Sequence, residues 1–339
     1  MTNLEGDALK QFCRGQGISI PFDLERIRNG RNSAVARVHN ASGQWILKHY
    51  YQNAQDGGDR RDRLGAEFAF LSFLNNTGDF PVAVPLGLDR QMHCALYSYV
   101  PGGRPNQVTE QHVAQAAAFI HDINRAEMAQ SALHLLPASD ACFRFSDHIQ
   151  LAESRIARLM TVKPTDSIER EAAAFIAERL APLMTRYKYE FTRNRARSSE
   201  NGGPSVSSRI ISPSDFGFHN VLELGGKLAF VDFEYAGWDD PVKLICDFIC
   251  QPELPVSAAQ AAQFTNQMLQ WLMQPERVQT SVQQLLPVYR LKWCCILLNE
   301  LRLDDRMRRV HAGRESDGAL AAQLTKVQEY YRNHLAHLL

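Results

Sequence analysis

The sequence predicts an α+β protein with two lobes, a small antiparallel β-rich lobe followed by a larger, mainly helical one. Two observations support this fold class. Strand-like segments separated by turn residues occupy positions 24–100, whereas helical spacing of apolar residues dominates after residue 108. The 339 residues are enough for two lobes, since domains commonly contain roughly 150 residues. Pro101-Gly102-Gly103 interrupts the pattern, and we therefore expect lobes at residues 1–100 and 101–339.

The first lobe is expected to contain an antiparallel meander, one helix and two further strands. The strands are predicted at residues 24–28, 34–39, 44–50, 82–88 and 95–100. Turn-forming residues at 29–33 and 40–43 separate the first three strands. Leu64, Phe68 and Leu71 have helical spacing, which predicts a helix over 61–74.

The second lobe is expected to be helical around a short β segment. Helices are predicted over residues 108–126, 145–160, 166–193 and within 257–339. The β segment comprises residues 210–211, 221–224 and 228–231, with a Gly225-Gly226 turn between the last two. Residues 195–208 are polar and predict a loop, whose role the sequence does not show.

Composition excludes several classes of protein. The chain has 37 basic and 37 acidic residues, which argues against a strongly basic nucleic-acid binder. Its apolar runs are too short to span a bilayer, and charged residues interrupt positions 1–20, where a secretory signal would be apolar. The seven cysteines show no CxxC spacing, which fits reduced thiols. We therefore expect a cytoplasmic protein that has no nucleic-acid or membrane partner.

Three oxygen-bearing side chains form the most informative pattern. Asp215 and Asn220 are five residues apart in a predicted loop, and Asp232 ends the strand after the next hairpin. The hairpin returns the chain, so the three can converge. Two carboxylates and an amide suit Mg²⁺ and leave one acid to orient a hydroxyl nucleophile. The alternative is that all three are ordinary turn and cap residues.

This pattern resembles the catalytic and metal-binding segments of kinase-fold phosphotransferases. The continuation at 232–241, Asp-Phe-Glu-Tyr-Ala-Gly-Trp-Asp-Asp-Pro, resembles the aminoglycoside and choline phosphotransferase family in particular, and the likeness extends over residues 24–300. It implies a protein-kinase-like fold and an Mg²⁺-dependent enzyme. That enzyme would transfer the γ-phosphate of ATP, or of GTP, to the hydroxyl group of a small acceptor.

The resemblance also implies roles for individual residues. Lys48 would bind the nucleotide phosphates and Glu67 would hold Lys48, although the two could instead be a solvated strand residue and a helix-face charge. Asp215 would align the acceptor hydroxyl, and Asn220 and Asp232 would hold Mg²⁺.

Two further segments would contact the nucleotide. A turn between the first two strands would cover it, although a plain hairpin is an equal alternative; the turn residues are Gly30, Arg31, Asn32 and Ser33. The adenine-contacting hinge would act through its backbone and comprises Tyr97, Tyr99 and Val100.

The sequence departs from the family pattern beside the catalytic position. Pro213 and Gly217 stand where the family usually has histidines, and His219 could take part instead. The first alternative function is therefore a nucleotide-binding pseudokinase with a regulatory or scaffolding role. The second is an unrelated α+β binding protein in which the pattern arises by chance.

The acceptor is not specified by the sequence. Family acceptors include aminoglycosides, choline, ethanolamine, sugars and amino-acid hydroxyls, and we favour a sugar or another small metabolite. Candidate acceptor contacts are Trp238, Trp293, Asn299 and Glu300. Asp247 is expected to bond the catalytic-loop backbone, and residues 302–309 to form a solvated helix end. ATP versus GTP and the oligomeric state stay open.

Overall fold

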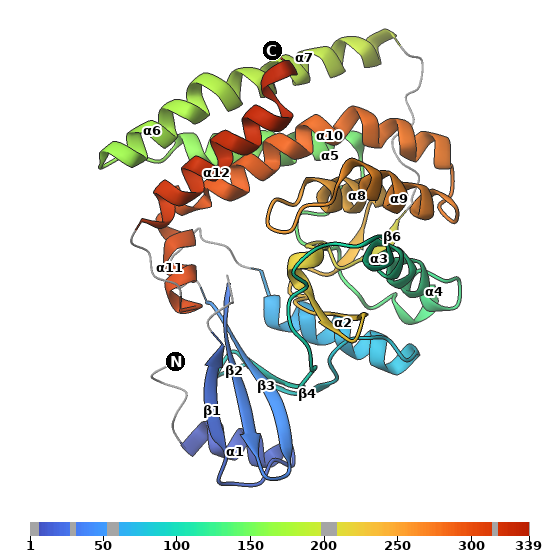
Figure 1. The fold of residues 1–339 in the computed structure, drawn as a ribbon, viewed down its shortest axis with the longest axis vertical. Coiled ribbons are helices and arrows are strands. Elements are labelled where there is room, and N and C mark those ends of the chain that lie inside the picture. The colour runs from blue at the N-terminus through green and yellow to red at the C-terminus, as the bar shows by residue number, and fades with distance from the viewer. Residues whose placement is uncertain (1–6, 28–31, 53–60, 198–208, 314–317, 339) are drawn as a thin grey trace.

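A five-stranded antiparallel sheet forms the first part of the computed structural model (Figure 1). The structure describes residues 7–27, 32–52, 61–197, 209–313 and 318–338. The sheet has the order β1-β2-β3-β5-β4. Its strands are β1 (Asp23–Ile27), β2 (Ser33–Asn40), β3 (Gly43–Tyr50), β4 (Pro85–Asp89) and β5 (Cys94–Ser98). All five lie at the predicted positions, with small shifts at their ends.

Both faces of this sheet are covered. Helix α1 (Asp7–Gly15), which the sequence analysis did not predict, packs on one face and buries Leu9 against Leu47 and Leu96. Helix α2 (Arg63–Thr77) lies beyond the other face, where Tyr50 and Tyr97 join the main core. Strand side chains alternate between the two faces, and this alternation directs Lys48 toward α2 while Leu47 points away.

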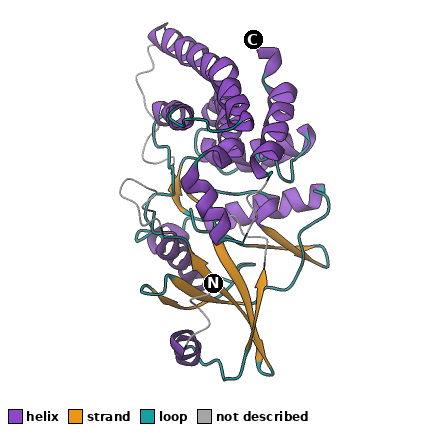
Figure 2. Cartoon of the chain, turned by 90° about the vertical axis from the view of Figure 1, so that its left-hand side faces the viewer, coloured by secondary structure: helices purple, strands orange, loops and turns teal. Residues whose placement is uncertain are grey.

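The rest of the chain is mainly helical, and Figure 2 shows most of the helices above the strands of the large sheet. None of the described helices combines the length and apolar character needed to cross a bilayer. The helices, with one π-helical and three 3₁₀ segments, are α3 (Glu110–Ile123), α4 (Met128–Ser131), α5 (Phe145–Met160), α6 (Ser167–Phe175), η1 (Ile176–Leu180), α7 (Ala181–Arg197), η3 (Phe218–Asn220), α8 (Pro241–Cys250), α9 (Ala258–Leu269), α10 (Pro275–Leu297), η4 (Leu298–Leu301), α11 (Leu303–His311), α12 (Ala319–His334) and η5 (Ala336–Leu338).

Two short two-stranded sheets lie within the helical part. Strands β7 (Val221–Leu224) and β8 (Lys227–Phe230) form the predicted hairpin. Strand β6 (Ile210–Ser212) pairs with β9 (Gly237–Asp239), which was not predicted. Pairing of Ser212 with Gly237 brings the segment before Asp215 beside the segment after Asp232.

A glycine is required at position 237. A Cβ atom there would lie 2.2 Å from the carbonyl oxygen of Leu136 and 2.7 Å from the backbone nitrogen of Ala138. Both neighbours are backbone atoms, which side-chain rotation cannot move away. This close approach fixes the path of the chain between the two segments that carry the candidate site.

The hydrophobic core continues across the expected boundary near residue 100. Phe119 of α3 stacks on Phe230 of β8 with ring centroids 4.2 Å apart, and Phe70 of α2 stacks on Phe233 at 5.0 Å. Phe230 N also donates a hydrogen bond to Pro81 O at 2.8 Å. The first-lobe helix therefore rests on the segment that carries Asp232. The seven cysteines are buried free thiols, as expected from their spacing.

Candidate active site

Lys48 of β3 forms a buried ion pair with helix α2. Its Nζ lies 2.6 Å from Glu67 Oε2, and that oxygen also accepts a hydrogen bond from the Tyr50 hydroxyl at 2.8 Å. Burial alone would lower the pKa of Lys48, but the carboxylates of Asp232 and Glu67 raise it well above its usual value. Lys48 therefore stays protonated. Both members of the pair are buried, so neither is the solvated charge that the sequence left open.

Asp232 follows β8 and places a partly exposed carboxylate beside Lys48. Its Oδ1 lies 2.5 Å from Lys48 Nζ, and 38 % of its side chain is exposed. Its φ of 68° lies in the left-handed region, which non-glycine residues adopt at an energetic cost. The next backbone N–H, that of Phe233, donates to Glu67 Oε1 at 3.2 Å. One buried glutamate thus holds both the lysine and the strained turn at Asp232.

Glu234 is a site residue that the sequence analysis missed. Its carboxylate accepts hydrogen bonds from Asn32 Nδ2 at 2.8 Å and Ser33 Oγ at 3.0 Å, and it lies 3.6 Å from Lys48 Nζ. Candidate ligand atoms of Glu67, Asp232 and Glu234 all lie within 4.8 Å of one another. The available signal was the second acid of Asp232-Phe233-Glu234, which follows the predicted metal ligand by two residues.

The loop between β6 and β7 carries the other two predicted residues. Asn220 Nδ2 donates to the main-chain oxygen of Asp215 at 3.0 Å. His219 Nε2 lies 3.2 Å from Asp215 Oδ1 and is the donor of that pair, since a carboxylate only accepts. Val231 N, directly before Asp232, donates to Asn220 O at 3.1 Å. The structure thus brings Asp215, Asn220 and Asp232 together, while their chemical roles stay predictions.

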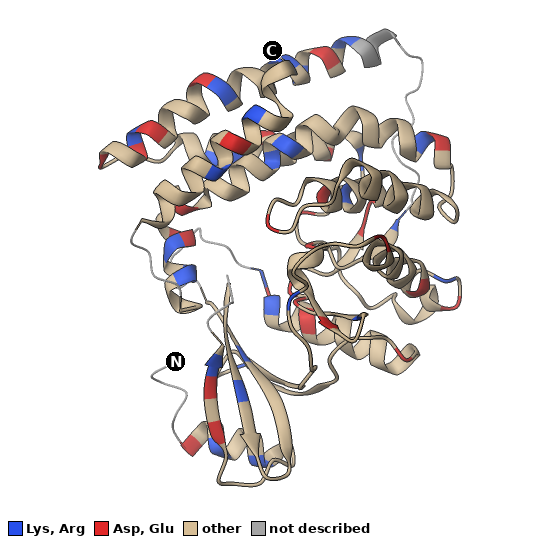
Figure 3. Cartoon of the chain, in the orientation of Figure 1, with Lys and Arg blue, Asp and Glu red and all other residues tan. Residues whose placement is uncertain are grey.

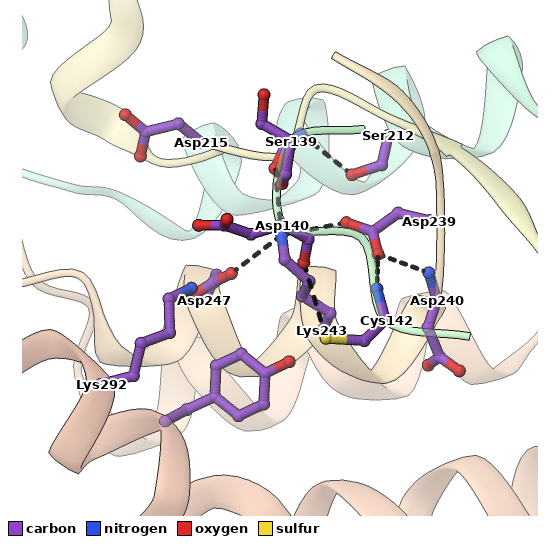
Figure 4. Close-up of polar contacts among 12 residues, drawn as sticks. Ser139, Asp140, Cys142, Ser212, Asp215, Asp239, Asp240, Lys243, Asp247 and Lys292 are labelled. Atoms are coloured by element: carbon purple, nitrogen blue, oxygen red, sulfur yellow. Dashed lines mark hydrogen bonds and ion pairs between the residues drawn. The ribbon is translucent and has the colours of Figure 1, made fainter. Parts of the chain in front are cut away.

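A buried lysine holds this loop near Pro213, one of the positions at which the sequence departs from the family pattern. Lys243 Nζ of α8 donates to Ser214 Oγ at 3.0 Å and lies 2.9 Å from Asp239 Oδ2. Figure 4 shows Lys243 together with the neighbouring acids Asp239 and Asp247. Burial lowers the pKa of Lys243, but the Asp239 and Asp247 carboxylates outweigh it and hold the pKa above its usual value. A protonated lysine therefore organises the loop that contains Pro213.

The predicted partner of Asp247 was wrong. Its carboxylate contacts Lys292 Nζ at 2.5 Å, Trp293 Nε1 at 3.0 Å and Lys243 Nζ at 3.3 Å. Among the described residues, it forms no hydrogen bond with the loop backbone. Asp247 lies one helical turn after Lys243 and faces α10, whose Lys292 and Trp293 both bond its carboxylate. Asp247 is linked to the loop at 213–220 through Lys243, which also bonds Ser214.

Half of the predicted nucleotide-covering turn can be placed. Gly30 and Arg31 lie outside the described residues. Asn32 and Ser33 both bond to Glu234, and Asn32 also donates to the Tyr235 hydroxyl at 3.0 Å. The end of this turn is therefore fixed to the segment that follows Asp232.

The predicted hinge follows the last sheet strand. Tyr97 lies within β5, and its buried hydroxyl is 2.7 Å from the Tyr50 hydroxyl. Tyr99 and Val100 come after the strand and are partly exposed. Tyr97 pairs with β3 and β4 within the sheet, whereas Tyr99 and Val100 lie beyond the strand pairing. The hinge role of the three residues stays a prediction.

A cavity of 310 Å³ lies beside Asp215. It is lined mainly by residues of α5, α8, α10 and α11 and of the loops at 139–140 and 214–219. Of the predicted acceptor contacts, Trp293 and Asn299 line this cavity, whereas Trp238 and Glu300 do not. The Trp238 indole instead donates to a backbone carbonyl, and Glu300 pairs with an arginine.

The charge run at 302–309 was wrongly predicted to be a solvated helix end. It forms most of α11, and five of its residues line the cavity: Arg302, Asp304, Asp305, Arg308 and Arg309. The side chains of Asp305 and Arg308 are only 7 % and 13 % exposed. A polar helix has the same sequence pattern whether it faces bulk water or a polar cavity.

Comparison with known proteins places this site in a family. A family model described as the phosphotransferase enzyme family matches residues 23–250, more than half of the chain. The chain belongs to this family. Within the phosphotransferase, the matched region includes every residue predicted to act on the nucleotide, the metal or the acceptor hydroxyl. No curated protein sequence matches the chain.

Solved structures resemble this phosphotransferase over nearly its whole length. A spectinomycin phosphotransferase in complex with ADP and spectinomycin has a TM-score of 0.59 at 11 % identity, covering 95 % of this chain and 98 % of its own. An ethanolamine kinase from Plasmodium vivax has a TM-score of 0.57 at 13 %, covering 98 % and 91 %. An amicoumacin kinase in complex with AMP-PNP, Ca²⁺ and Ami has a TM-score of 0.56 at 13 % identity, covering 98 % of this chain and 95 % of its own. The predicted protein-kinase-like fold is confirmed.

Proposed function

We propose that this phosphotransferase transfers the γ-phosphate of ATP, or of GTP, to a hydroxyl group of a small-molecule acceptor. One observation carries the proposal. The Lys48–Glu67 ion pair contacts Asp232, and a backbone hydrogen bond joins that segment to the loop that presents Asp215 to a cavity. Nucleotide would bind between residues 1–100 and 101–339, with Tyr99 and Val100 beside its base.

The residues present fit a hard cation. The Asp232 carboxylate and the Asn220 amide oxygen are donors that Mg²⁺ accepts. The Asn220 amide nitrogen is already bonded to Asp215 O, which directs the amide oxygen elsewhere. Asn220 and Asp232 would hold Mg²⁺, which when bound neutralises charge on the transferred and leaving phosphates. The ADP, AMP-PNP and Ca²⁺ in the neighbouring structures support a nucleotide and cation site here.

Asp215 would act on the acceptor. Its carboxylate would accept a hydrogen bond from the acceptor hydroxyl and align that oxygen with the γ-phosphorus. As the new O–P bond forms and the bond to the β-phosphate oxygen breaks, the hydroxyl proton would pass to Asp215. The hydrogen bond from His219 restricts rotation of this carboxylate. Lys48 would neutralise phosphate charge, and Glu67 would hold it in place.

A nucleotide-binding pseudokinase is the second candidate, and Pro213 favours it. The contact between Lys243 and Ser214 weakens this alternative, because it holds the loop without the usual histidine. The two candidates differ in one measurable property, which is acceptor-dependent release of ADP.

The test combines binding with turnover. Thermal unfolding of the wild type with Mg-ATP or Mg-GTP should show stabilisation, about 2.7 kcal/mol at 100 times the Kd. Asp232→Ala should lose this stabilisation. Asp215→Ala should keep it and lower kcat by about 10²-fold or more. Asp79→Ala, at an exposed position that is not one of the predicted site residues, is the control. Equal losses of nucleotide binding in both site variants would refute the assigned roles.

A further inference from the structure

The cavity beside Asp215 carries an excess of basic side chains. Eight basic and five acidic residues line it, a difference of three positive charges. Lys48 and Asp232 are not among its lining residues, so this charge lies apart from the proposed nucleotide phosphates. Figure 3 shows Lys and Arg positions on α11, one of the helices that form the cavity.

The acidic residues of the cavity are already engaged by basic ones. Asp140 contacts Arg61 at 2.9 Å and also Arg155. Burial raises the pKa of Asp140, but Arg155 and Arg61 outweigh it and hold the pKa far below its usual value.

The other acidic residues of the cavity, apart from Asp215, are also paired with basic side chains. Asp247 is bonded to two lysines, while Asp304 and Asp305 pair with Arg302 at 3.5 Å and 3.4 Å. Asp215 itself is assigned to the acceptor hydroxyl. A cationic acceptor would therefore have to displace existing ion pairs.

Among the described residues, one basic side chain of this cavity has no acidic partner. Within the described part of the chain, the guanidinium of Arg158 forms no hydrogen bond or ion pair. Burial lowers its pKa, and the neighbouring charges of Arg155 and Arg302 lower it further. The Nε of Arg155 is also buried without a hydrogen-bond partner. Three guanidinium groups lie near one another here: Arg155 is paired with Asp140 and Arg302 with Asp304 and Asp305, whereas Arg158 has no such partner among the residues that the structure describes.

We infer that Arg158, together with Arg155 and Arg302, binds an oxyanion group of the acceptor, a phosphate or a carboxylate. The inference rests on the proposed function and specifies its substrate class as a hydroxyl compound with a negative charge. Guanidinium groups bind both kinds of oxyanion in a planar, two-bond geometry. The anion would relieve the mutual repulsion of the arginines, and the attraction would draw the acceptor toward Asp215.

Binding of the anion is tested first and without turnover. The full chain is saturated with Mg-ADP, so that the nucleotide site is filled, and titrated with inorganic phosphate and with acetate while thermal unfolding is followed. At least one oxyanion should stabilise the wild type. Arg158→Gln should raise its Kd about tenfold, the loss of one charge-assisted interaction, and Arg158→Lys should recover part of that loss. Arg170→Gln, an exposed arginine on α6, is the matched control.

Three results would overturn the inference. They are no oxyanion binding to the wild type, an equal Kd in Arg158→Gln, or an equal loss in Arg170→Gln. Matched acceptors then separate the two chemistries: glucose 6-phosphate, gluconate, glucose and choline are compared by ADP release. Transfer only to neutral or cationic acceptors, with a KM unchanged in Arg158→Gln, would also overturn it. Oxyanion binding without transfer to any acceptor would instead count against the proposed function and leave the anion site standing.

Discussion

Glu67 should make a larger contribution to the stability of this phosphotransferase than any surface ion pair. It is 4 % exposed and accepts three hydrogen bonds, from Lys48, Tyr50 and the backbone of Phe233. Removing one partner of a buried ion pair costs about 3–5 kcal/mol. Without Glu67, Lys48 would still have two carboxylate partners, Asp232 at 2.5 Å and Glu234 at 3.6 Å. We therefore expect Glu67→Ala to lower the free energy of unfolding by about 3 kcal/mol, the lower end of that range.

A double-mutant cycle isolates the pair itself. Urea unfolding at pH 7 of the wild type, Lys48→Met, Glu67→Gln and the double variant gives the coupling free energy, which we expect to be about 2 kcal/mol. The exposed pair of Lys188 and Glu153 is the control, since it has a similar distance of 2.7 Å but side chains 54 % and 45 % exposed. Its coupling should stay below about 1 kcal/mol. If the two couplings were equal, burial would not set the strength of the Lys48–Glu67 pair, and the reasoning would fail.

Three further predictions concern packing and pH. Gly237→Ala should destabilise the fold by more than about 3 kcal/mol in chemical denaturation, because its Cβ would lie 2.2 Å from Leu136 O; a loss below 1 kcal/mol would show that the backbone yields. Phe119→Ala should cost about 3–5 kcal/mol, since its ring is buried and stacked on Phe230; wild-type stability would contradict this. Burial lowers the pKa of His148 to about 3. Below pH 6.5 the unfolded chain therefore binds a proton at His148 that the folded chain does not bind. Stability should fall as pH drops from 6.5 toward 3, and His148→Phe should reduce the slope by about 1.4 kcal/mol per pH unit; identical slopes would refute the neutral buried histidine.

The sequence by itself determined the fold class and the positions of most elements. Turn residues and alternating apolar residues predicted all five strands of the large sheet, because local chemistry decides where a chain turns and which side chains face inward. The spacing of Asp215, Asn220 and Asp232 predicted that a hairpin would bring them together. Lys48 and Glu67 were paired through the family resemblance rather than through any local signal.

Only the tertiary structure decided which charges meet. Glu234, Lys243 and the arginines of α5 and α11 resemble ordinary charged residues in the sequence, and α11 was predicted to be solvated. Their contacts join residues far apart in the chain, such as Glu234 with Ser33 and Lys243 with Ser214. Whether a charged side chain faces water, a buried partner or a cavity depends on the packing of distant elements, because electrostatic interactions act across space and leave no periodic trace in the sequence.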